Sequence, residues 1–409
     1  MSSGGGSSSG GSTPRARKLR DYIFPRPLVG AYATAPPTSA AARAPDGDEC
    51  IYYEGLRALP TFGGFEVPLL PGGVLHAEDE AWLIRQLILP PCDRIVITMI
   101  PATAVANEAN PFFGLASTDA AGRAAAVELT RAACAAAGRI NAAAGRVLVH
   151  GVEIHSAPSR HKGGDSSEEA FTASLLEIAK MPWDGARIIV EHCDALPKGG
   201  DSVSRTPAKG FMTIDEEFRS IEAANEALKA EQQKVLGVDA GESIGLKRTR
   251  IFYGVNWARS VLETHDADTP TQHFTAGMDG RQLLPGILVF SGCTGLEGSL
   301  YGAWKDSHVP SSQIVTESLM TPSAMSAILV HWFTLDWNEQ QSEDSGGAQA
   351  PFLGVKIHLK KDGAITPAER IAANADALVL IDRFLRVDEK QMGEAIRETD
   401  PDRRTCTIL

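Results

Sequence analysis

The sequence lacks the features that mark several large classes of protein. Its six cysteines lie far apart, with no CxxC pair and no ladder of spacings typical of a disulfide scaffold. No apolar run approaches the ~18 residues that a membrane-spanning helix needs. The opening MSSGGGSSSGG has no apolar core of the kind found in secretory signals. We therefore expect a non-secreted protein of a reducing compartment, without a transmembrane segment.

Clusters of positive charge are also missing. The formal net charge is −12, and the basic residues are scattered along the chain. A DNA, RNA or anionic membrane partner needs a concentrated basic surface. This charge pattern disfavours all three as the principal ligand.

Both ends of the chain read as tails. Residues 1–27 are Ser/Gly-rich and then basic, a composition that cannot bury enough apolar surface to order itself. A Ser/Arg-rich start is also compatible with a mitochondrial transit peptide, but the glycine run spoils an amphipathic helix, so a cytoplasmic location is favoured. Residues 386–409 are expected to form a flexible C-terminal tail.

The last four residues, Cys406-Thr407-Ile408-Leu409, fit a C-a-a-X prenylation box whose leucine favours geranylgeranyl transfer. Such a box also arises by chance. In a eukaryotic source, one isoprenoid on Cys406 would give only marginal, reversible membrane binding. The expectation is therefore a partly membrane-associated pool at most.

Between the tails, short β-rich runs alternate with longer helical patterns. The helical stretches are 78–88, 118–145, 166–180, 213–230, 321–332 and 366–385, with N-caps expected at Thr118-Asp119 and Ser166-Ser167. The predicted strands are 28–34, 65–70, 94–100, 146–154, 187–192, 250–256, 287–291 and 352–359. Eight strands that alternate with helical stretches predict one (β/α)₈ barrel, a TIM barrel, over residues 28–385. The competing open doubly wound sheet is disfavoured because no GxGxxG follows the first strand.

A barrel concentrates its chemistry at the carboxyl ends of its strands. Glu66 lies on the second strand, Glu153 and His155 end the fourth, and Glu191 ends the fifth. Strand alternation places Glu153 and His155 on one face. We expect these carboxylates to converge at the barrel mouth, either as catalytic groups or as ion-pair partners of arginines and lysines there.

The loop after the seventh strand brings Asp306 and His308 close together. A carboxylate and an imidazole two residues apart can ligate a metal or form a base dyad, and the alternative is a cap and turn before Pro310. Trp257 and Trp304 could offer apolar platforms for a sugar face, or belong to the core. Asn256 and Arg259, at the end of the sixth strand, join the predicted substrate-binding set.

The eighth strand places Lys356, His358 and Lys360 on one face. An inward lysine is costly without an anionic partner or a lowered pKa. Lys356 is therefore predicted to be a substrate clamp, a nucleophile or the counter-ion of Glu191, and His358 joins the substrate-binding set.

Several ordered motifs resemble one known family. VGAYATAP near the start, VEHCDA at the fifth strand, NWARSVLE at the sixth, and LLPGILVFSGC with GAWKDSHVP at the seventh are similar to the domain-of-unknown-function 4862 family. The resemblance spans roughly residues 28 to 385 and implies a place among the xylose-isomerase-like barrels.

The wider superfamily contains sugar isomerases, epimerases and related enzymes, many with a divalent metal bound at the ends of strands five to eight. By this resemblance, Glu191 matches the expected carboxylate of the fifth strand. Asn256 stands where an aspartate is usual, Ser291 where a histidine is usual, and Lys356 or His358 where a second glutamate is usual. The departures leave metal-dependent and metal-free chemistry equally open.

Two mechanisms and one non-enzymatic alternative follow for a small sugar-like substrate. With Mn²⁺, Mg²⁺ or Zn²⁺ held by Glu191, Asp306 and His308, the ion would polarise a carbonyl, and Glu153 or His155 would move the proton in an isomerisation or epimerisation. Without a metal, Lys356 would stabilise an enediolate or form the Schiff base of a lyase or aldolase. The third alternative is a non-catalytic sugar-binding barrel. The sequence leaves a homodimer open.

Overall fold

The computed structural model describes residues 26–196, 208–236, 251–281, 283–341 and 351–386. Both predicted tails and the candidate lipidation site Cys406 lie largely or wholly outside these ranges.

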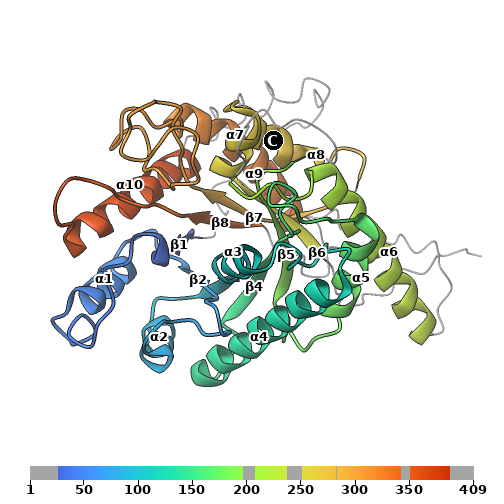
Figure 1. Cartoon of the computed structure of the whole chain (residues 1–409). Coiled ribbons are helices and arrows are strands. Elements are labelled where there is room, and N and C mark those ends of the chain that lie inside the picture. The colour runs from blue at the N-terminus through green and yellow to red at the C-terminus, as the bar shows by residue number, and fades with distance from the viewer. Residues whose placement is uncertain (1–25, 197–207, 237–250, 282, 342–350, 387–409) are drawn as a thin grey trace, which may run out of the picture.

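Eight parallel strands close into a barrel in chain order, with β8 paired to β1 (Figure 1). Their bounds are β1 Leu28–Gly30, β2 Gly64–Pro68, β3 Arg94–Thr98, β4 Val149–Ile154, β5 Arg187–His192, β6 Ile251–Asn256, β7 Pro285–Phe290 and β8 Phe352–Val355. The predicted TIM barrel is confirmed, and each predicted strand contains one of these eight or overlaps it.

The first and last strands are shorter than the sequence predicted. After Gly30 the chain turns at once into the short 3-10 helix η2 (Ala31–Thr34), and β8 ends at Val355. The strand alternation expected for Lys356, His358 and Lys360 therefore does not apply to them.

Helices surround the strands on the outside of the barrel (Figure 1). They are α1 Asp48–Arg57, α2 Glu80–Leu87, α3 Ile100–Ala109, α4 Ala120–Ala144, α5 Glu168–Ile178, α6 Ile214–Leu236, α7 Trp257–Thr264, α8 Thr269–Ala276, α9 Pro322–Gln341 and α10 Pro367–Leu385. Helices α1, α3, α7 and α8 were not predicted. The predicted caps are present: Asp119 accepts a hydrogen bond from Gly122 N at 2.6 Å, and Ser167 accepts one from Ala170 N at 3.1 Å.

The barrel interior is packed by apolar side chains. A buried cluster separate from the main core joins Leu28, Val96, Ile189, Val289 and Phe352 with Ile287. Glycines of intervening strands make room for it, since a Cβ on Gly151 would lie 3.0 to 3.3 Å from Phe352, Ile189 and Val96. Most of these side chains come from the alternate strands β1, β3, β5 and β7, as is usual in a TIM barrel, and Phe352 adds one from β8. The apolar layer forms the floor on which the polar mouth rests.

Of the helices in the described part of the chain, none combines the length and apolar character that crossing a bilayer requires.

Candidate active site

A ring of polar side chains lies directly above the apolar layer. Strand side chains repeat their direction every second residue, so Thr98 follows Val96 and Glu191 follows Ile189 on the inner face. Every strand contributes to the ring, at its carboxyl end or just after it: Tyr32, Glu66, Thr98, Glu153, Glu191, Asn256, Ser291 and Lys356. All but Tyr32 are at least 98% buried. The predicted convergence of Glu66, Glu153 and Glu191 is thus observed.

Glu191 lies at the centre of this ring. Its Oε2 is 2.8 Å from Arg259 Nη1 and 2.8 Å from His155 Nε2. Its Oε1 accepts a hydrogen bond from Asn256 Nδ2 at 3.1 Å, and Ser291 Oγ in turn donates to Asn256 Oδ1 at 2.7 Å. Burial raises the pKa of Glu191, but the charges of Arg259 and Lys356 outweigh burial and hold that pKa well below its usual range. Glu191 is therefore ionised.

Lys356 pairs chiefly with Glu66. Its Nζ is 2.6 Å from Glu66 Oε1 and 3.8 Å from Glu191 Oε1, so Glu191, the counter-ion considered from the sequence, is the more distant partner. The Nζ also lies 5.6 Å from the ring centroid of Tyr32, whose hydroxyl donates to Glu66. Burial lowers the pKa of Lys356, but Glu66 and its neighbours raise it well above the ordinary value. The side chain is an ammonium ion.

Glu153 is the carboxyl group of this ring that forms no ion pair with a described residue. Among the described residues, no donor makes a well-formed hydrogen bond to either of its oxygens, although the hydroxyl of Thr98 is adjacent. Burial, together with the charges of Glu191 and Glu66, raises the pKa of Glu153 well above its usual value. Burial therefore favours the protonated form of Glu153, which makes the residue a potential general acid.

His155 is neutral and oriented by Glu191. Burial lowers its pKa to about 4, despite the neighbouring carboxylate. Because ionised Glu191 only accepts hydrogen bonds, Nε2 of His155 carries the hydrogen and Nδ1 carries the lone pair. No described residue donates to that buried Nδ1. His155 thus presents a free basic nitrogen, held in one tautomer by Glu191.

Arg259 occupies the space between the carboxylates predicted to bind a metal. Its Nη1 bonds Glu191, and its Nε lies 3.4 Å from Asp306 Oδ2, which Lys209 Nζ approaches to 3.5 Å. His308 Nδ1 is 3.5 Å from Asp306 Oδ1. The two residues therefore lie close together, as the sequence predicted, but neither of these two atoms makes a hydrogen bond to a described residue.

The three predicted ligands do not fit a divalent cation. Glu191 and Asp306 already direct their oxygens at a guanidinium, and a second cation there would be repelled by it. Within the described part of the chain, the side chains whose ligand atoms lie close enough together to share a metal ion are those of His192, Glu263 and His273.

The other predicted substrate-binding residues, Trp257, Trp304 and His358, pack against or bond to other parts of the protein. Trp257 is fully buried in the main core. Trp304 is stacked on His265, with ring centroids 3.8 Å apart, so one of its faces is covered. His358 is half-buried, and its backbone N donates to His308 O at 2.7 Å.

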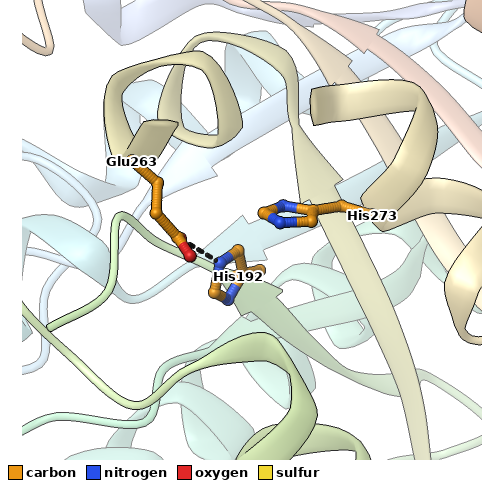
Figure 2. A group of neighbouring side chains, drawn as sticks. All are labelled: His192, Glu263 and His273. Carbon is orange, nitrogen blue, oxygen red and sulfur yellow. Dashed lines mark hydrogen bonds and ion pairs between the residues drawn. The ribbon is translucent and has the colours of Figure 1, made fainter. Parts of the chain in front are cut away.

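The group of His192, Glu263 and His273 lies on the outer side of β5. His192 Nδ1 is 2.7 Å from Glu217 Oε2 on α6, and His192 Nε2 is 2.8 Å from Glu263 Oε2 on α7. Figure 2 shows Glu263 directed at His192, with His273 of α8 beside them. Burial lowers the pKa of His192, but Glu217 and Glu263 raise it to about 10. Strand alternation puts His192 on the opposite face of β5 from Glu191, but its helical partners gave no recognisable signal in the sequence.

The sequence comparisons identify the family. The family model for the domain of unknown function DUF4862 matches residues 28–336. The chain belongs to the DUF4862 family. A Salmonella typhimurium protein named as uncharacterized is 31% identical over 296 residues, which are 72% of this chain and 81% of that protein. The predicted family is thus confirmed, and the DUF4862 match stops before β8 and α10, which complete the barrel here.

Solved structures share the fold of this DUF4862 chain. A fusion protein of a xylose isomerase-like TIM barrel and 4-hydroxyphenylpyruvate dioxygenase is 10% identical, with a TM-score of 0.51. The match covers 91% of this chain and 45% of the fusion protein, so the chain spans under half of that protein. A sugar phosphate isomerase/epimerase from Parabacteroides distasonis has a TM-score of 0.43 at 10% identity, covering 89% of this chain and 96% of the other. At this level of identity, the likeness concerns the fold alone.

Proposed function

We propose that the chain is an isomerase or epimerase that moves a proton next to the carbonyl group of a small polyhydroxylated, sugar-like substrate. The observation that carries the proposal is that Glu153 and His155 lie two residues apart at the end of β4, where burial raises the pKa of the carboxyl and lowers that of the imidazole. An acid and a base of this kind, beside two buried cations, are the parts that enolisation requires.

The proposed step uses these groups in fixed roles. Nδ1 of His155 takes the proton from the carbon next to the carbonyl, and Glu153 gives its proton to the carbonyl oxygen, which yields an enediol. His155 then gives its proton to the neighbouring carbon, while the carboxylate of Glu153 takes the proton of the other enediol hydroxyl, which becomes the new carbonyl and completes an isomerisation. Epimerisation would require the enediol to turn over in the site before His155 returns the proton to the opposite face of the same carbon. Glu191 orients His155 and stabilises the imidazolium, as the buried aspartate does in serine-protease triads.

The positive charges act on the oxygen where negative charge develops. Lys356 and Arg259 are both buried in the ring, at contact distance from Glu66 and Glu191 respectively. A buried cation stabilises a developing enediolate more strongly than one in water. The same surroundings disfavour the lyase or aldolase alternative, because a Schiff base requires Lys356 as a neutral amine and Glu66 holds it as ammonium.

The test is incubation in D₂O with a panel of aldoses, ketoses and sugar acids, followed by proton NMR. We expect a new isomer or epimer together with deuterium at the carbon next to the carbonyl. His155→Gln should abolish both changes, whereas His150→Gln, near the amino-terminal end of the same strand and away from the mouth, should retain them. Cleavage products would indicate a lyase instead, and binding without any turnover would indicate a non-catalytic barrel.

A further inference from the structure

We propose that His192, Glu263 and His273 form a zinc-binding site on the outer side of β5. One ligand atom from each residue lies within 4.8 Å of the other two, which is close enough to surround a single ion (Figure 2). Two imidazoles and one carboxylate, with a fourth position left over, form a ligand set that zinc accepts. Magnesium, which prefers oxygen ligands, is disfavoured.

The groups behind the ligands match those of metal sites. A metal-binding histidine usually donates its second N–H to a carboxylate or another acceptor, which fixes its tautomer. Glu217 holds Nδ1 of His192 in this way, and Ser156 Oγ donates to Glu217 at 2.5 Å. Ser260 Oγ lies 3.0 Å from Nδ1 of His273. Each histidine therefore keeps Nε2 as its ligand atom.

Burial and charge also favour an ion. His192 and Glu217 are almost fully buried, and the side chain of Glu263 is 19% exposed, which leaves one approach from solvent. Glu217 and Glu263 place two carboxylates on one imidazole. If a zinc ion replaces the proton between His192 and Glu263, the imidazole of His192 is neutral. The two positive charges of the ion then balance the two carboxylates, Glu217 and Glu263.

The zinc site would act by holding residues of the barrel mouth in position. His192 follows Glu191 in β5, and Glu263 lies one turn after Arg259 in α7. An ion shared by His192 and Glu263 therefore ties together the two elements that carry the Glu191–Arg259 ion pair. This is a role for residues on the outer face of β5, away from the ligands that the sequence predicted inside the barrel.

The test is zinc titration of the chelator-treated full chain by calorimetry, with metal analysis after dialysis and Co²⁺ as a coloured substitute. We expect one equivalent bound and a higher Tm in the zinc form. His273→Gln should weaken affinity at least about tenfold. Glu217→Gln, which removes no ligand, should weaken it about 10- to 100-fold. His331→Gln, a half-buried histidine of α9, is the matched control and should bind as the wild type does.

Three outcomes would overturn the proposal: no bound zinc, equal affinity in His273→Gln and His331→Gln, or loss of binding in Asp306→Asn instead. Circular dichroism checks the fold of each variant. If His273→Gln fails to fold, Glu217→Gln decides the question. Since the readout is metal binding, failure of the proposed isomerase activity would leave this result unaffected.

Discussion

Arg259 Nη1 lies 2.8 Å from Glu191 Oε2, and both side chains are excluded from solvent. A buried pair of this kind owes its attraction to the low local dielectric, and each partner depends on the other for compensation of its desolvation cost. The pair also fixes what the mouth can do, since it keeps Glu191 ionised and places a guanidinium where a metal was predicted.

Glu191→Gln should therefore reduce stability as well as activity. Removing one partner of a buried ion pair costs about 3–5 kcal/mol, because the other charge is left uncompensated. The measurement is urea unfolding of the variant. Glu168→Gln, which breaks the exposed pair with Arg219, is the control and should cost about 1 kcal/mol or less. Equal small losses in both variants would contradict a buried, strongly coupled pair.

Lys356 should resist Schiff-base formation. Glu66 at 2.6 Å favours the ammonium ion, which cannot attack a carbonyl. The experiment is incubation with ketoses and aldoses, reduction with borohydride, and peptide mass analysis, for which we expect no adduct at Lys356. Glu66→Gln removes the main counter-charge and should make trapping easier. A reduced adduct at Lys356 in the wild type would favour the aldolase mechanism.

The chelator-treated protein should become less stable at alkaline pH, because His192 loses its proton there. Its folded-state pKa is about 10, above the ordinary value of 6.5, so its stabilising contribution is complete below pH 6.5. That contribution is lost as pH rises through about 10. Unfolding free energies from pH 6 to 10 should fall in the wild type and fall less steeply in His192→Gln. Parallel curves would show that the His192 pairing contributes nothing.

The barrel and the composition of its mouth could be predicted from the sequence. Strand periodicity places Glu153, His155 and Glu191 at strand ends, and parallel strands bring their ends to one rim. The first and last strands were predicted too long, because the chain leaves the sheet after Gly30 and Val355 while its composition remains β-rich.

The partners of these residues could not be predicted. Arg259 lies in a helix that was not predicted, and its direction toward both Glu191 and Asp306 is a tertiary property. The group on the outer side of β5 joins a strand to helices α6, α7 and α8, whose relative placement no local pattern determines. Which carboxyl keeps a proton also depends on distances between strands.

The most direct test of the account is the protonation state of His155, measured by ¹⁵N NMR of labelled protein. The chain has 10 histidines, so the spectrum of His155→Gln identifies the signal that belongs to this residue. With a pKa of about 4, His155 should be neutral from pH 6 to 8, with the hydrogen on Nε2 and an unprotonated Nδ1. It should become charged only as pH falls toward 4. An imidazolium at neutral pH, or a hydrogen on Nδ1, would contradict the assignment of His155 as the base.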